Sequence, residues 1–288
     1  MINERNINLS IILISYNHAS YIREAIESIL KQKFNSKIQL IVADDKSTDR
    51  TLDIIREYDG IDHRFSFEYL SQEKNIGITK NYQRAFQACI GDYIAILEGD
   101  DIWANDEKLR KQIIALENNK NCVFCSSNYY LFNEKIGIQG TRTPHGKGGS
   151  MYYDVPFIIK DNLPGNFSAI VYRKNVIERL PQEIFNFKSY DWVINIFSGL
   201  FGDFIYLYEP LSFYRIHENG TWSSLSVKQK KVEQMKTILF CKNLIQNKYD
   251  KEFDDVFKKL KIENAKISWR GVFLIKIIKG ILKCKKEI

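Results

Sequence analysis

The sequence lacks the glycine-rich loops by which many nucleotide-binding proteins hold phosphate groups. No G-x-G-x-x-G follows the first apolar segment, Leu9 to Ile14, which excludes the usual dinucleotide site of a Rossmann fold. No Walker A sequence occurs anywhere, which excludes hydrolysis at a P-loop. The missing loop also argues against a nucleotidyltransferase that builds sugar nucleotides, because such an enzyme needs glycines after its first strand.

Long apolar runs are missing too, and cysteines are few. No run approaches the ~18 apolar residues of a membrane-spanning helix. The polar residues Met1 to Asn8 and the short apolar segment after them do not form a secretory signal peptide. The five cysteines are odd in number and scattered, which fits a reducing cytosol. Cys122 and Cys125 lie in a strand-like run and face opposite sides of it, so we expect core packing rather than zinc or redox chemistry.

Most of the chain lacks excess charge of either sign, although the net charge is +7. Seven of the 42 Lys/Arg residues but only one of the 35 Asp/Glu residues lie from Asn264 to Ile288. The rest is nearly neutral, so we expect no nucleic acid as a partner.

The basic C-terminal segment shows the pattern of an amphipathic helix. Lysines on one side of a helical wheel face apolar residues on the other: Lys276, Lys279, Lys283 and Lys286 against Leu274, Ile277, Ile278, Ile281 and Leu282. Such a helix binds a membrane surface, or it docks on the body or on a second subunit with its lysines in solvent.

Apolar strands and amphipathic helices alternate through the first 101 residues. The pattern predicts strands at 9–14, 38–43, 65–70 and 93–97, separated by helices. The order β-α-β-α-β-α-β indicates an α/β fold with a mainly parallel sheet and right-handed crossovers.

Polar side chains follow three of these strands where each one ends. They are Ser15 to Asn17, Asp44 with Asp45, and Glu98 to Asp101. Ligands bind open α/β sheets at this edge. The three acids of the last cluster repel one another, and a hard divalent cation shared with a phosphate would offset that repulsion. A solvated acidic turn is the other interpretation.

The motifs resemble those of glycosyltransferase family 2. They read IILISYN at 11–17, VADDKSTD at 42–49, NIG at 75–77 with Asn81, and GDYIAILEGDD at 91–101. The resemblance covers roughly the first 120 residues in register. It implies a GT-A fold, with helices on both faces of the sheet, and an inverting transfer of sugar from a nucleotide donor.

The resemblance also implies roles for single residues on the donor side. Asp45 would accept the N3–H of a uracil-type base, and Asp44 would support it or reach the ribose. The implied nucleotide-binding set is completed by Ser15, Tyr16, Asn17, Asn81, Glu98 and Asp100. Asp100 and Asp101 would hold Mn²⁺ or Mg²⁺, with His217 reaching the metal or the diphosphate. Ile14, Lys46 and Glu98 stand where proline, glycine and aspartate are common in the family.

The catalytic base of the family lies in a short acidic segment before an apolar helix. The segment FKSYDWV at 187–193 is similar to it, with Tyr190 in place of the usual glutamate. We therefore expect Asp191 to be the base, and it can also cap the helix at 192–200. Arg215 is a candidate phosphate partner or a member of a structural ion pair.

The second half of the chain is expected to form the acceptor side. A helix is predicted at 105–118 and strands at 123–132 and 166–172. The glycine-rich segment at 141–150 is either a mobile lid or an inert loop. We expect a glycosyltransferase domain at 1–225, with donor binding at 1–101 and the acceptor side at 102–225, and a helical extension at 226–288.

The predicted function is that of a hexosyl- or N-acetylhexosaminyltransferase using a UDP-sugar and a saccharide or lipid-linked acceptor. Its place would be the synthesis of a bacterial surface polysaccharide, in the cytoplasm and peripheral on the inner face of the membrane. Two alternatives stay open. One is a non-catalytic relative that binds a nucleotide sugar, and the other is a membrane-surface scaffold.

Overall fold

The computed structural model describes residues 8–143, 149–188 and 191–284, with side chains up to 267. The chain divides into two compact units, Met1–Ile216 and His217–Ile288, which are described separately. The functional domains that the sequence predicts, divided after residue 225, stay a prediction.

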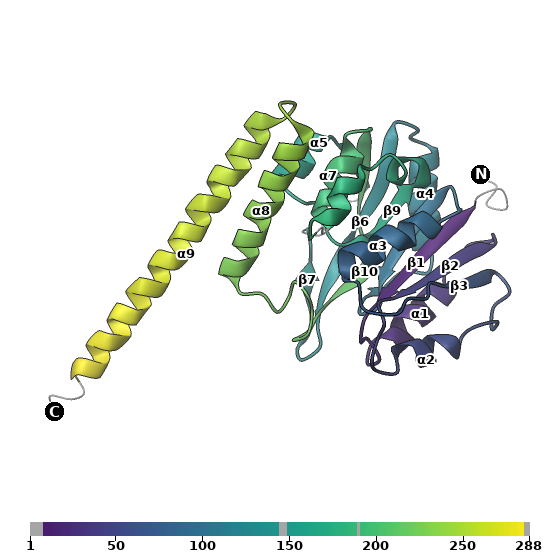
Figure 1. Cartoon of the computed structure of the whole chain (residues 1–288), viewed down its shortest axis with the longest axis horizontal. Coiled ribbons are helices and arrows are strands. Elements are labelled where there is room, and N and C mark those ends of the chain that lie inside the picture. The colour runs from purple at the N-terminus through teal and green to yellow at the C-terminus, as the bar shows by residue number, and fades with distance from the viewer. Residues whose placement is uncertain (1–7, 144–148, 189–190, 285–288) are drawn as a thin grey trace. The chain divides into compact units, whose positions relative to one another are not determined.

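The first unit contains one sheet with the strand order β3-β2-β1-β4-β9-β6-β10-β5, while β7 pairs with β6 and β8 with β10 (Figure 1). The strands are β1 Leu9–Ser15, β2 Ile38–Asp44, β3 Phe65–Tyr69, β4 Tyr93–Glu98, β5 Ile102–Trp103, β6 Cys122–Asn133, β7 Gly137–Thr141, β8 Ser150–Tyr153, β9 Ile170–Arg173 and β10 Asp203–Ile216. The strands β3, β2, β1 and β4 are parallel neighbours, as predicted. The second half is mixed, because β9 lies antiparallel between β4 and β6.

Helices cover both faces of this sheet, as expected. They are α1 Ile22–Leu30, α2 Thr51–Arg56, α3 Ile78–Ala88, α4 Lys108–Glu117, α5 Val155–Lys160, α6 Lys174–Ile177 and α7 Asp191–Gly199. Alternate residues of β1 share one buried cluster with α1, α2 and α4, because successive side chains of a strand point to opposite faces. The helix α3 packs on the other face, against β1 and β2.

The segment at 166–172 differs from the predicted strand. A 3₁₀ turn, η2, occupies Phe167–Ala169, and β9 begins only at Ile170. The polar side chains of Asn166 and Ser168 turn toward the end of β4 and form hydrogen bonds there, which the extended pattern did not indicate. A second 3₁₀ turn, η3, covers Gln182–Asn186. Cys122 and Cys125 are buried core residues, as predicted.

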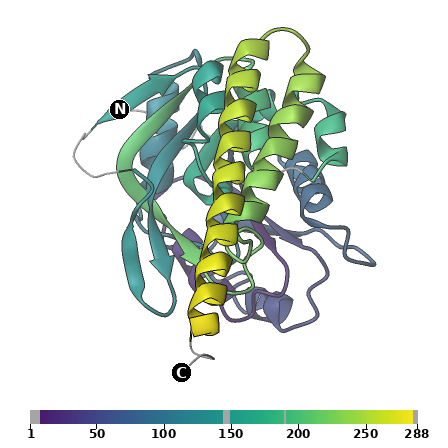
Figure 2. The same cartoon turned by 90° about the vertical axis from the view of Figure 1, so that its left-hand side faces the viewer.

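The second unit is a pair of helices that lie side by side (Figures 1 and 2). They are α8, Val227–Ile245, and α9, Asp250–Cys284. Ser226 caps α8 through a reciprocal hydrogen-bonded pair with Gln229. The described helices include none that is both long and apolar enough to cross a membrane. The amphipathic side chains at 274–286 lie outside the side chains that the structure describes, so their predicted role stays a prediction.

Candidate active site

The loops after β1 and β2 are joined by a small cluster of hydrogen bonds, of which the one between Ser15 and Asp44 is buried. The hydroxyl of Ser15 donates to Asp44 Oδ2 at 2.9 Å, and the backbone N–H of Ser47 donates to Asp44 Oδ1 at 2.8 Å. Asn17 adopts the left-handed region, with φ of 55°, and its side-chain oxygen accepts the N–H of Thr48 at 2.8 Å. Ser15 and Asp44 therefore fix the shape of this edge, while Tyr16 is exposed.

Asp45 is held by the loop that carries the NIG motif. Its carboxylate accepts the backbone N–H groups of Ile76 and Gly77, each at 2.9 Å, and the amide of Gln72 at 2.5 Å. Gly77 has a φ of 85°, which favours glycine and turns its N–H toward Asp45. The motif around residue 77 thus positions the carboxylate that is predicted to receive the base.

Asn81 joins α3 to the end of β2. Its amide donates to the carbonyl of Ala43 at 2.7 Å, and its oxygen accepts Arg84 Nε at 2.7 Å. Arg84 also donates to the carbonyl of Asp44 at 2.8 Å. Asn81 is 1% exposed, so its side chain holds the backbone at the end of β2.

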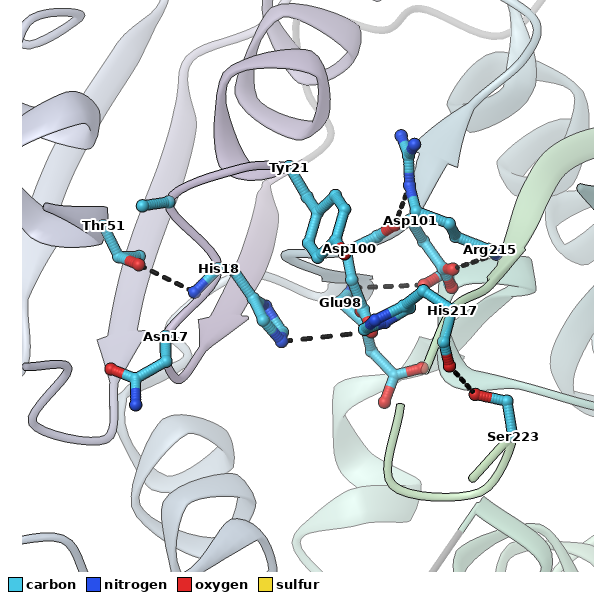
Figure 3. Close-up of polar contacts among 12 residues, drawn as sticks. Asn17, His18, Tyr21, Thr51, Glu98, Asp100, Asp101, Arg215, His217 and Ser223 are labelled. Atoms are coloured by element: carbon cyan, nitrogen blue, oxygen red, sulfur yellow. Dashed lines mark hydrogen bonds and ion pairs between the residues drawn. The ribbon is translucent and has the colours of Figure 1, made fainter. Parts of the chain in front are cut away.

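The acidic turn after β4 is anchored from α3, from the segment before η2 and from β10, and Figure 3 shows its acids with Arg215 of β10. Tyr82 of α3 donates its hydroxyl to Glu98 Oε1 at 3.0 Å. Asp101 accepts the amide of Asn166 at 2.8 Å and the backbone N–H of Arg215 at 2.9 Å. The structure therefore brings together acids and partners from distant parts of the sequence.

Arg215 forms structural ion pairs, which was one of its two predicted roles. Its guanidinium lies 2.5 Å from Glu24 Oε2 and 3.8 Å from Glu134 Oε1. Nε also donates to the carbonyl of Asp100 at 2.8 Å.

His18 lies beside the acidic turn, although the sequence did not single it out. Its Nε2 is 3.9 Å from Asp100 Oδ2, as Figure 3 shows. Gly99 permits this approach, because a Cβ there would lie 2.8 Å from His18 Nδ1 and 2.8 Å from Ile22 Cδ1. The backbone N–H of His18 donates to Thr51 at 2.8 Å. His18 is thus a residue of the site that only the fold reveals.

The carboxylates of the site raise one another's pKa. Burial raises the pKa of Glu98 well above its ordinary value, and the charges of Asp101, Asp100 and Asp191 raise it further. Burial likewise raises the pKa of Asp101, with Asp100 adding to the effect and the N–H of Arg215 opposing it. A positive charge at this edge of the sheet would relieve the repulsion between the carboxylates.

Asp191 begins α7 and acts electrostatically on the acidic turn. Its Oδ1 accepts the backbone N–H of Trp192 at 2.6 Å and the amide of Asn162 at 3.1 Å. Burial raises its pKa from 3.8 to about 7, against the lowering effects of these hydrogen bonds and of Arg142. A carboxylate with this pKa can accept a proton near neutral pH. The neighbouring Tyr190 lies outside the described residues.

The donor set fits a cation only in part. Both oxygens of Asp101 already accept hydrogen bonds from the protein, whereas Asp100 is partly exposed. Within 8–143, 149–188 and 191–284, no group of three His, Cys, Asp or Glu residues is arranged to hold a metal ion. The residues present fit Mg²⁺ or Mn²⁺ in the mode that uses one or two carboxylates and completes its shell with phosphate and water.

Two further features that the sequence predicts for the site, His217 and the glycine-rich lid, are not placed at it by the first unit. His217 is the first residue of the second unit, where its carbonyl accepts the hydroxyl of Ser223 at 2.8 Å (Figure 3). Its role at a metal stays a prediction. The centre of the predicted lid, residues 144–148, lies outside the described residues, so the choice between a lid and an inert loop stays open.

Comparison with known proteins identifies one family. The family model described as Glycosyl transferase family 2 matches residues 10–180. A Bacillus subtilis (strain 168) protein named as a teichuronic acid biosynthesis glycosyltransferase is 35% identical over 123 residues, 43% of this chain and 47% of that protein. An uncharacterized protein of Mycobacterium tuberculosis (strain ATCC 25618 / H37Rv) is 29% identical over 223 residues. That match covers 77% of this chain, which spans only 63% of the mycobacterial protein.

Solved structures share the fold. S. aureus TarS 1-349 in complex with UDP-GlcNAc superposes with a TM-score of 0.62 at 19% identity, covering 88% of this chain and 71% of that one. A mannosyltransferase from Pyrobaculum calidifontis in complex with GDP-Man and Mn²⁺ gives a TM-score of 0.57 at 14% identity, covering 89% and 68%. These likenesses confirm the predicted GT-A fold.

Proposed function

We propose a function for this chain from the premise that it belongs to glycosyltransferase family 2. In this proposal it moves a hexosyl or N-acetylhexosaminyl group, with inversion, from a UDP-sugar to a hydroxyl of a saccharide or lipid-linked saccharide. The UDP-GlcNAc complex of TarS supports the choice of UDP. The name of the Bacillus subtilis relative supports a place in the synthesis of a bacterial surface polysaccharide.

The base of the donor would bind at Asp45. The three hydrogen bonds that Asp45 accepts from the protein leave room for another, because an ionised carboxylate has about four acceptor positions. Uracil offers its N3–H to such an acceptor. Ser15, Asp44 and Asn81 would act by holding the surrounding backbone, while the exposed ring of Tyr16 is able to contact the base.

A Mn²⁺ or Mg²⁺ ion would bind at Asp100, with Asp101 beside it and His217 as a further candidate ligand. When bound, such an ion supplies positive charge that offsets the charge developing on the diphosphate leaving group. Glu98 accepts a hydrogen bond from Tyr82 of α3. We assign Glu98 to the ribose of the donor rather than to the metal.

Asp191 would act as the general base. It takes the proton of the acceptor hydroxyl while the acceptor oxygen bonds to the anomeric carbon. As that bond forms, the bond from the anomeric carbon to the diphosphate breaks on the opposite face, and its electron pair leaves with the diphosphate. One observation carries this proposal: the carboxylate of Asp191, at the start of α7, has a pKa raised to about 7, and its charge raises the pKa of Glu98 at the end of β4.

Calorimetric titration of UDP, dTDP, GDP and CDP, with and without Mn²⁺, tests the donor site. We expect Mn²⁺-enhanced binding of UDP that is lost in Asp45→Ala and kept in Asp191→Asn. Release of UDP from UDP-GlcNAc or UDP-glucose should be lost in Asp191→Asn. Binding without turnover for any acceptor would favour the non-catalytic relative. If no nucleotide bound, the family likeness would extend to the fold alone.

The C-terminal helix would hold the enzyme at the inner face of the membrane, where a lipid-linked acceptor lies. The support is the charge pattern of residues 274–286 in the sequence. Sedimentation with vesicles of phosphatidylglycerol and phosphatidylcholine tests this proposal. Deletion of residues 264–288 should abolish binding to the anionic vesicles while UDP binding is kept. If the shortened chain bound the vesicles equally well, the remaining interpretation would be a helix that docks on the body of the protein or on a second subunit.

A further inference from the structure

A chain of hydrogen-bonded amide groups, those of Asn195 and Asn162, links Tyr172 to Asp191. The hydroxyl of Tyr172 on β9 lies 2.5 Å from Asn195 Oδ1 on α7. Asn195 Nδ2 lies 3.1 Å from Asn162 Oδ1, in the loop after α5. Asn162 Nδ2 in turn lies 3.1 Å from Asp191 Oδ1. Tyr172 and Asn195 are 0% exposed, so water does not compete for the hydrogen bond between them, while Asn162 is half-buried.

The charge of Asp191 sets the direction of every hydrogen bond in this chain. An ionised carboxylate only accepts, so Asn162 must present its NH₂ group to Asp191. Its oxygen then faces Asn195, which must present its own NH₂ group, and the oxygen of Asn195 receives the hydroxyl of Tyr172. All three donors therefore point toward Asp191, and each amide has one orientation that satisfies the network.

The two carboxylate oxygens of Asp191 differ in the hydrogen bonds that they accept. Oδ1 accepts both Trp192 N–H and Asn162 Nδ2, whereas Oδ2 accepts no hydrogen bond from the residues that the structure describes. We propose that Asn162, oriented by Asn195 and Tyr172, is a positioning residue that keeps Oδ1 unprotonated and leaves Oδ2 to take the acceptor proton. The inference rests on the proposed function, in which Asp191 is the base.

The sequence position of Asn195 supports a role beyond packing. It lies in the middle of α7 between the buried Ile194 and Ile196, where an apolar residue would avoid the cost of burying an amide. Among the described residues, the positive charge that lowers the pKa of Asp191 is that of Arg142, which is also paired with Asp161. From the other elements, the charge of Asp191 raises the pKa of Glu98 of β4 and of three tyrosines, Tyr82, Tyr129 and Tyr172. Of the described side chains around Asp191, that of Asn162 is the one that donates a hydrogen bond to its carboxylate.

Selective ¹³C labelling of aspartate carboxyl groups tests the inference without an acceptor. The Asp191 signal, assigned with Asp191→Asn, should titrate near pH 7 in the wild type. In Asn162→Ala, and less so in Tyr172→Phe, it should titrate at higher pH, because the ionised form has lost a donor. Tyr93→Phe is the control, since its hydroxyl pairs with Glu117 at the opposite end of β4. An Asp191 titration unchanged in Asn162→Ala and Tyr172→Phe would overturn the inference.

The kinetics of UDP release from a UDP-sugar give a second test of the inference. We expect kcat to fall about 10- to 100-fold in Asn162→Ala and about threefold or more in Tyr172→Phe, with KM for the donor unchanged. If Asn162→Ala and Tyr172→Phe lowered the melting temperature but left kcat unchanged, as expected of the control, the network would only stabilise the fold. That result would overturn the inference while the proposed function stands. Full turnover in Asp191→Asn would overturn both.

Discussion

Asp101 Oδ1 accepts the backbone N–H of Arg215 at 2.9 Å, across 114 positions of the sequence. The side chain of Arg215 reaches the same turn, because its Nε donates to the carbonyl of Asp100 at 2.8 Å. One residue of β10 therefore holds both neighbouring acids. The guanidinium is also placed over the rings of Tyr21 and Phe132, at 5.1 and 5.3 Å from their centroids.

Replacing this guanidinium should destabilise the fold more than removing a surface one. Arg215→Met keeps an apolar stem but loses the hydrogen bond to Asp100 and the ring contacts. We expect the free energy of unfolding to fall by about 2–4 kcal/mol in urea titrations. Arg23→Met is the control, because that side chain is 50% exposed and its ion pair with Glu57 is screened by solvent, so its loss should change stability little. Equal losses in the two variants would contradict an anchoring role for Arg215.

Lys46 carries backbone strain that glycine would remove. Its φ is 64°, in the left-handed region, and its side chain is exposed. Lys46→Gly should raise the free energy of unfolding by about 1 kcal/mol, and Lys46→Ala should not, because alanine keeps the Cβ that causes the strain. Urea unfolding of both variants measures the difference. If the two variants are equally stable, the strain at this position is negligible.

Part of the fold and of the site could be predicted because local sequence determines it. Buried parallel strands need continuous apolar residues, so β2 and β4 could be predicted from their apolar runs. The acids that follow them lie at the carboxyl ends of parallel strands and therefore meet at one edge of the sheet. The strain at Lys46 also gives a physical reason for the glycine that is common there in the family.

The remaining features depend on contacts between distant residues. Asn166 and Ser168 sit in an apolar stretch that predicts a strand, and only their contacts with Asp101 and Glu98 explain the turn. His18 has no local signal, because Asp100 is its neighbour only through the pairing of β1 with β4. The insertion of β9 between β4 and β6 likewise follows from strand order, which periodicity does not encode.

Asp100 should account for the dependence of nucleotide binding on a cation. In the wild type we expect Mn²⁺ to strengthen UDP binding and EDTA to reverse the effect. In Asp100→Asn the enhancement should be lost, because the amide is a poorer ligand for a hard cation. Asp106→Asn is the control, since its carboxylate pairs with Lys33 on the surface. Calorimetric dissociation constants with and without Mn²⁺ decide the matter, and an undiminished enhancement in Asp100→Asn would exclude Asp100 as a ligand.

Asp191 should make the fold less stable as the pH rises. Its pKa is 3.8 as an ordinary group and about 7 in the folded protein. Between these values the folded state holds a proton that the unfolded state has released. Unfolding therefore releases a proton in this window, and stability falls with rising pH until the cost is complete above about pH 7.

Asp191→Asn removes this cost and should be more stable than the wild type at pH 8, with the difference shrinking toward pH 5. Loss of the charge also relieves Glu98, whose pKa Asp191 raises, so both effects have the same sign. Asp62→Asn gives the opposite sign as a control, because hydrogen bonds from Arg64 lower the pKa of Asp62 and its ionised form stabilises the fold throughout this range. Urea unfolding at pH 5 to 8 measures all three proteins. If Asp191→Asn gained nothing at pH 8, the ionised carboxylate would carry no cost in the fold, and it would then lack the raised basicity that a general base needs at neutral pH.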